Sequence, residues 1–132
     1  MTIQELYQNI NGDYDQAVRI LRMDKLIDKH IRKFPENNVS DNFFAAGNSM
    51  NPTELFETAH ALKGVCSNLG LMNLSDAFSE ISEEYRPGSA RKFSEEEVKT
   101  KIEMIRNMYA NTVEGIKRYA ESVEQSGQNY II

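Results

Sequence analysis

The segment from Asn51 to Gly70 constrains the fold most, because it contains the start, the body and the end of one long helix. Asn51 can cap the amino end, Pro52 suits the first helical position, and Glu54 places an acidic side chain in the first turn. Gly70 can adopt the left-handed backbone conformation that ends a helix. The sequence therefore predicts a helix from Pro52 to Leu69.

Capping and terminating signals of the same kind divide the rest of the chain into further helices, whereas strand-like alternation is nearly absent. The predicted ranges are 2–11, 13–22, 23–34, 38–47, 71–85 and 94–126. Short connections between long amphipathic helices favour antiparallel neighbours. The sequence therefore predicts an all-α protein, an up-and-down antiparallel four-helix bundle with short extra N-terminal helices.

A chain of 132 residues has the length of a single domain. We expect short N-terminal helices at 2–22 that pack across one end, a bundle at about 23–126 built from the four longest helical patterns, and a flexible tail at 127–132. The polar stretch 86–93 serves as a connector before the last helix.

Charge and composition narrow the function classes. The net charge is −5 and the lysines and arginines are scattered, which argues against nucleic-acid binding. No apolar run approaches the ~20 residues that span a bilayer, and no secretory signal is visible. Cys66 is the only cysteine, so an intramolecular disulfide is impossible. We therefore expect a cytoplasmic monomer that binds proteins rather than nucleic acid or membrane.

The predicted helix at 52–69 places a histidine on its outer face. Residues spaced by about 100° form an apolar stripe that faces the core. The stripe consists of Leu55, Ala59, Leu62, Cys66 and Leu69. His60 lies roughly 140° from the centre of this stripe, together with Glu57, Gly64 and Ser67, and Lys63 lies at the edge of the same face.

Gly64 is the anomaly of this face. Glycine inside a helix costs about 0.5–1 kcal/mol relative to alanine, with no structural gain at an exposed position. As residue i+4 it leaves open space beside His60, and Lys63 at i+3 can place an ammonium near an anion on the ring. An exposed neutral imidazole is a competent nucleophile towards phosphorus. We therefore predict that His60 accepts a phosphoryl group.

Other candidate residues are less informative. Phe56, one turn before His60, fills the seam between helices or forms an apolar contact around the histidine, and we favour packing. Glu57 and Ser67 are possible partner contacts. Cys66 lies on the core stripe, which predicts a packed and poorly ionised thiol. His30 has no comparable neighbours and is interpreted as a surface or partly buried residue.

The stretch from Ala59 to Gly70, with His60, Lys63 and Gly64 in it, resembles the signature of histidine-containing phosphotransfer (Hpt) domains of bacterial multistep phosphorelays. The resemblance is sharp over 54–84 and extends more loosely from about 14 to 119. It implies a bundle without a catalytic site of its own. The histidine would receive phosphate from a receiver-domain aspartate and return it to another.

The same resemblance implies the remaining features of the site. Receiver domains of response regulators or hybrid histidine kinases are the implied partners. The chain itself would need no cofactor, and Mg²⁺ is expected on the receiver. Many relatives place a glutamine that orients the imidazole where this chain has Ser82, whose side chain is shorter. Because the sequence contains no kinase or receiver segment, we expect a free-standing relay intermediate.

Two other classes remain to be compared. Glu57-x-x-His60 fits the spacing of di-iron helical bundles, but Ile27 stands three residues before His30, so the second copy of the motif is missing. The other alternative is a helical protein-interaction module, such as a kinase docking domain, whose histidine carries no phosphate. Nothing in the sequence excludes this module.

Overall fold

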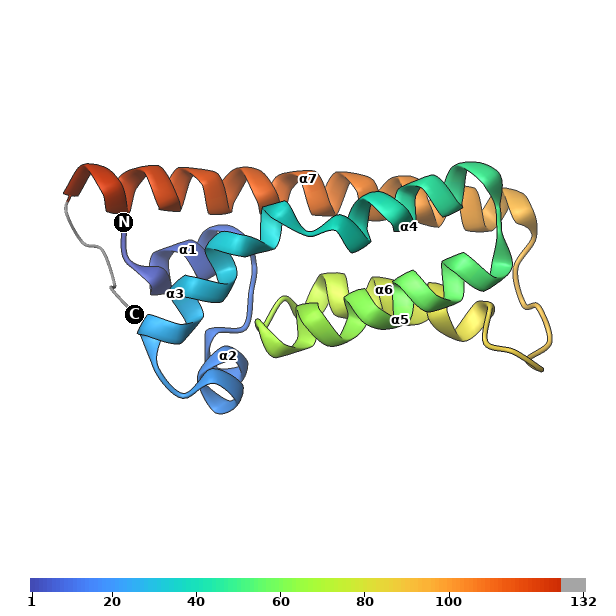
Figure 1. Ribbon diagram of the computed structural model, residues 1–132, viewed down its shortest axis with the longest axis horizontal. Helices are drawn as coiled ribbons and strands as arrows, with labels where there is room; N and C mark the ends of the chain where they lie inside the picture. Colours follow the sequence, from blue (N-terminus) through green and yellow to red (C-terminus); the bar gives the residue numbers. More distant parts are fainter. Residues whose placement is uncertain (127–132) are drawn as a thin grey trace.

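The computed structural model describes residues 1–126, apart from the side chain of Ser126, and within this range it contains helices but no strands (Figure 1). The helices are α1 (Ile3–Asn9), α2 (Tyr14–Leu21), α3 (Asp24–Lys33), the 3₁₀ turn η1 (Phe34–Glu36), α4 (Asn38–Ser49), α5 (Pro52–Asn68), α6 (Met72–Glu84) and α7 (Glu95–Ser126). The expected tail at 127–132 lies outside the described residues.

Four of these helices, α4 to α7, pack side by side as a four-helix bundle, and α7 runs along the whole length of the molecule (Figure 1). Each bundle helix buries one apolar stripe in a common core. Representative members are Phe43 of α4, Leu62 of α5, Phe78 of α6 and Ile105 of α7, which are all almost completely inaccessible to solvent. The predicted all-α fold is therefore confirmed.

The boundary signals of α5 act as the sequence predicts. The Asn51 side chain accepts a hydrogen bond from the backbone N–H of Glu54 at 3.1 Å. At the other end Gly70 has a φ of 71°, which is left-handed. A Cβ at Gly70 would also collide with the carbonyl oxygen of Asp13, while the Asp13 N–H donates to the Gly70 carbonyl at 2.7 Å. This close approach requires glycine and joins the end of α5 to the start of α2.

The helix α4 differs from the helix that the sequence predicts. The sequence predicts an end at Gly47, which would make this helix shorter than the one predicted at 23–34. It continues to Ser49, and left-handed Met50 (φ 53°) terminates it. Gly47 is a packing residue, because a Cβ there would lie 3.2 Å from the Ile102 side chain of α7. In contrast α3 stops at Lys33, before the 3₁₀ turn that contains Pro35. The bundle therefore uses α4, and α3 lies at its end.

The short N-terminal helices pack at the same end of the molecule, as predicted (Figure 1). The helix α1 contacts α7, and α2 lies against α3 and α5. Tyr7 of α1 is buried and donates a hydrogen bond to the Leu69 carbonyl at 2.6 Å, which connects this end to α5. None of the described helices has the combination of length and apolar character that a membrane span needs.

Candidate functional site

The helix α5 separates a buried face from an exposed face in the way the sequence predicts. Four stripe residues, Leu55, Ala59, Leu62 and Cys66, have no accessible surface, and Leu69 is only 5% exposed. His60 and Glu57 are exposed on the opposite side. A carboxylate and an imidazole that both face solvent do not form the inward-facing site of a di-iron bundle.

The space beside His60 is open. A Cβ built at Gly64 would meet no heavy atom within 4 Å. The glycine therefore has no packing role within the described residues, which distinguishes it from Gly47 and Gly70. Its missing side chain leaves one side of the imidazole accessible to a partner.

Lys63 is half-buried at the edge of the His60 face and takes part in none of the ion pairs found between residues 1 and 126. Its backbone carbonyl accepts a hydrogen bond from the Ser75 hydroxyl of α6 at 3.1 Å. This bond holds the backbone of α5 beside the histidine. No sequence pattern singles out Ser75, whose one local signal is that it is a serine next to the buried Leu74 of α6.

Phe56 contacts the histidine rather than the core. The two rings are stacked, with centroids 5.7 Å apart and an angle of 20° between their planes. Phe56 is half-buried and is not part of the core cluster or of its partly buried margin. Of the two alternatives for Phe56, our preference for packing in the seam was therefore wrong. The stacked phenyl ring supports one face of the imidazole.

Ser82 lies on α6 and is only 2% exposed. Among the hydrogen bonds of the described residues, none joins Ser82 to the His60 ring. The ring of His60 is instead contacted by Phe56. Ser67 is half-buried one turn beyond Lys63. An orienting role for Ser82 and partner contacts by Glu57, Ser67 and Phe56 stay predictions.

The two remaining candidates lie apart from this face. Burial raises the pKa of the Cys66 thiol to about 12, in agreement with the predicted inert thiol. His30 is exposed on α3, so it is a surface residue. Within residues 1–126 no group of three or more His, Cys, Asp or Glu side chains is arranged to hold a metal ion.

Comparison with known families identifies the class of protein. Residues 2–115 match the Hpt domain, which is well over half of the chain, and the chain therefore belongs to the Hpt domain family. Membership implies histidine phosphotransfer in a phosphorelay, and Hpt domains interact with receiver domains. No match is found among curated proteins or among solved structures.

Proposed function

We propose that His60 is the phosphoryl acceptor of this Hpt domain, that it takes the group from the aspartyl phosphate of a receiver domain, and that it passes the group to the aspartate of another receiver. The observation that carries the proposal is the exposed imidazole next to Gly64, where an added Cβ would meet no neighbouring heavy atom within 4 Å. Of the two histidines, only His60 has this arrangement within the family signature.

The chemistry needs little from this chain beyond position and charge. The unprotonated ring nitrogen of His60 attacks the phosphorus of the aspartyl phosphate. A nitrogen–phosphorus bond forms, the bond between phosphorus and the aspartate oxygen breaks, and the aspartate leaves as a carboxylate. The other ring nitrogen keeps its proton. The onward transfer is the reverse of this step on the second receiver.

Three neighbours support this step. Lys63 brings an ammonium to the phosphoryl oxygens, where negative charge develops in the transition state. Phe56 stacks on the imidazole and restricts the directions in which the ring can turn. Gly64 leaves room for the aspartate of the receiver to approach in line with the attacking nitrogen. The receiver supplies the magnesium ion.

The test is to incubate the chain with purified receiver domains that have been phosphorylated with acetyl phosphate and magnesium. We expect an acid-labile, alkali-stable phosphate on the wild type and on His30→Gln, and none on His60→Gln. Phosphate that remains on His60→Gln would contradict the assignment. A wild type that accepts phosphate from no receiver would favour the alternative, a helical interaction module that carries no phosphate.

A further inference from the structure

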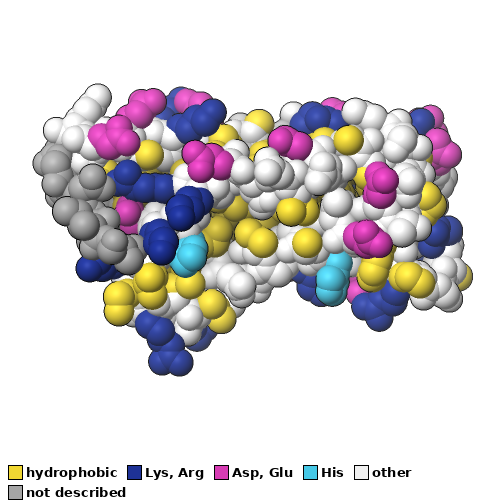
Figure 2. Space-filling model, viewed as in Figure 1, with side chains coloured by type: hydrophobic (Ala, Val, Ile, Leu, Met, Phe, Trp, Pro, Cys, Tyr) yellow, Lys and Arg dark blue, Asp and Glu magenta, His cyan; other side chains and the backbone are white. Residues whose placement is uncertain are grey.

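The direction of the His60 ring depends on the side chains around it. On a helix the first side-chain torsion is restricted to two of the three staggered rotamers, whereas the second torsion of a histidine is broad. The backbone of α5 therefore fixes where the imidazole begins and leaves its plane free to turn. Figure 2 shows both histidine side chains of the chain at the surface on one face of the molecule. Solvent does not hold such a ring in one orientation.

Polar neighbours do not fix the plane of this ring. In the described part of the chain, the side-chain hydrogen bonds and ion pairs do not include the His60 imidazole. Glu57 is exposed three residues earlier, and Ser82 of α6 is buried without a bond to the ring. Gly64, four residues later, has no side chain to offer. A restraint on the imidazole must therefore come from the turn before it.

Phe56 contacts the imidazole from that turn. The two rings are nearly parallel, with an angle of 20° between their planes and 5.7 Å between their centroids. Residues four apart lie about 6 Å apart along a helix axis, so the helix itself provides this separation. Aromatic pairs at such distances favour an offset stack, in which each ring covers only part of the other. The phenyl ring can therefore hold the plane of the imidazole and still leave a nitrogen open to a partner.

The first turns of α5 define where Phe56 stands. Its side chain is half-buried and follows Leu55, which has no accessible surface. The Asn51 side chain accepts from the Glu54 N–H at 3.1 Å, and the Thr58 hydroxyl donates to the Glu54 carbonyl at 2.6 Å. A phenyl ring has only two side-chain torsions, so holding it in place costs less entropy than holding a long polar side chain.

We infer that Phe56 is the positioning residue of phosphotransfer, and that it directs the His60 ring by an aromatic stack instead of a hydrogen bond. The stack holds the imidazole in a plane from which a ring nitrogen faces the incoming phosphorus. This role rests on the proposed function of His60. No atom of Phe56 takes part in the bonds that form and break. Its effect is on alignment, and a misplacement of about 1 Å in the attacking geometry costs about a hundredfold in rate.

The test measures single-turnover transfer at varied concentrations of the phosphorylated receiver that is most active on the wild type. Phe56→Leu keeps an apolar side chain but removes the ring, and Phe56→Tyr keeps the ring. Phe93→Leu is the matched control, because Phe93 is also half-buried but lies against the Lys101 ammonium, 4.4 Å from its ring centroid. Phosphoramidate, a small donor that needs no docking surface, measures the intrinsic reactivity of His60.

We expect Phe56→Leu to lower the maximal transfer rate about tenfold, while the receiver concentration that gives half of this rate stays unchanged. Phe56→Tyr should restore most of the rate, and Phe93→Leu should change neither quantity. The rate with phosphoramidate should be the same in all variants, since a small donor can follow a ring that turns. In NMR spectra, contacts between the two rings and the ring-current shifts of the imidazole protons should persist in Phe56→Tyr and vanish in Phe56→Leu.

Other outcomes overturn the positioning role in distinguishable ways. If Phe56→Leu needs more receiver but reaches the wild-type maximal rate, Phe56 is a contact for the receiver. Equal losses with the receiver and with phosphoramidate would show that Phe56 changes the reactivity of the nitrogen and not its direction. An unchanged rate in Phe56→Leu would leave the stack without a role in transfer. A wild type that phosphoramidate phosphorylates but no receiver does would refute the proposed donor and this role together, before any variant is compared.

Discussion

Replacement of Gly64 separates function from stability at one position. Alanine in place of an exposed helical glycine stabilises a helix by about 0.5–1 kcal/mol, because the unfolded chain loses conformational freedom. At Gly64 the added Cβ meets nothing within 4 Å, so neither a clash nor a new contact alters this value. We therefore expect Gly64→Ala to raise the free energy of unfolding by about 0.5–1 kcal/mol and the melting temperature by roughly 2–4 °C.

The larger side chain of Gly64→Gln should leave stability unchanged or slightly raised, since glutamine is also a good helix former. It would stand one turn from His60, where the receiver must bring phosphorus within roughly 3–3.5 Å of the attacking nitrogen. A displacement of about 1 Å at this stage costs about a hundredfold in rate, so we expect transfer from a phosphorylated receiver to fall by that order.

The assay combines urea unfolding, followed by circular dichroism, with single-turnover phosphotransfer. Gly70→Ala is the control for a glycine that the fold requires, because a left-handed φ of 71° and the nearby Asp13 carbonyl oppose any side chain at this position. It should lose more than about 2 kcal/mol. If Gly64→Gln unfolds the protein while its folded fraction still transfers phosphate normally, Gly64 serves packing and the placement of the His60 face is refuted.

Three further predictions concern charge, metal and pH. Lys63→Met keeps the aliphatic stem and should slow receiver transfer about tenfold or more without changing the melting temperature, so equal rates would make Lys63 a bystander. Calorimetry on the chain alone should detect no micromolar Mg²⁺ site, because Glu57 is the only carboxylate on the His60 face of α5. Burial raises the pKa of the Cys66 thiol from 9.0 to about 12, so the thiol ionises at a lower pH in the unfolded chain than in the folded protein. The stability that the neutral buried thiol contributes is therefore complete below pH 9.0 and is lost as the pH rises towards 12. By pH 10 the loss should be about 1.4 kcal/mol in urea unfolding, and an unchanged pH slope in Cys66→Ala would contradict this.

The features that could be predicted from the sequence depend on residues close together along the chain. The ends of α5 follow from Asn51, Pro52 and Gly70, because capping and left-handed termination involve groups within one helical turn. The outward direction of His60 follows from the helical period, which fixes the angle between residues on one helix. These local rules were enough to indicate the helical fold, the histidine and the open position at Gly64.

Local rules failed wherever a residue's role depends on another helix. The sequence could not show that Gly47 lies inside α4, because its purpose is to admit Ile102 from α7. It could not choose between the two roles of Phe56, since a helical wheel shows the direction of a side chain but not which neighbour it meets.

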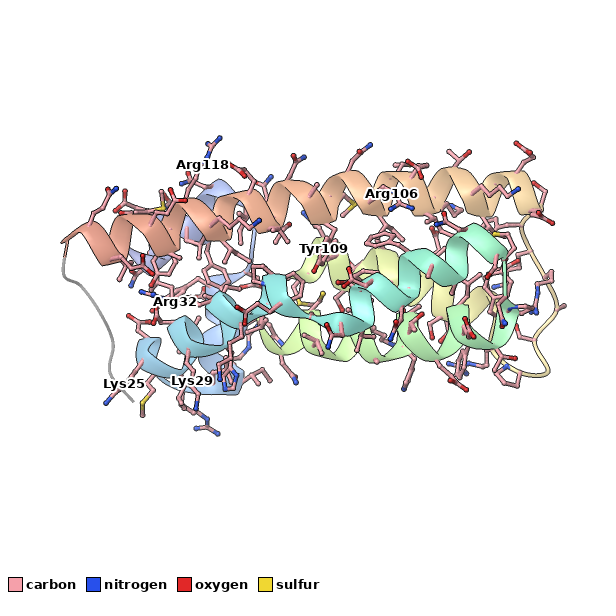
Figure 3. All side chains as sticks on the ribbon, turned by 45° about the horizontal axis from the view of Figure 1, so that its top comes forward. Lys25, Lys29, Arg32, Arg106, Tyr109 and Arg118 are labelled. Atoms are coloured by element: carbon pink, nitrogen blue, oxygen red, sulfur yellow. The ribbon has the colours of Figure 1, made fainter. Side chains whose placement is uncertain are left out.

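The sequence by itself determined which stretches are helical, which stripe of each helix is apolar, and that His60 faces away from the stripe of its own helix. Tertiary structure alone decided that Leu21, Phe34 and Val65, from three different parts of the chain, meet in one groove. It also decided that Asp28 is buried and accepts a hydrogen bond from the Tyr119 hydroxyl of α7, whereas Lys25 and Lys29 of the same helix extend away from the bundle (Figure 3). The physical reason is that periodicity orients a side chain about its own helix axis, whereas packing between helices decides which distant residues become neighbours.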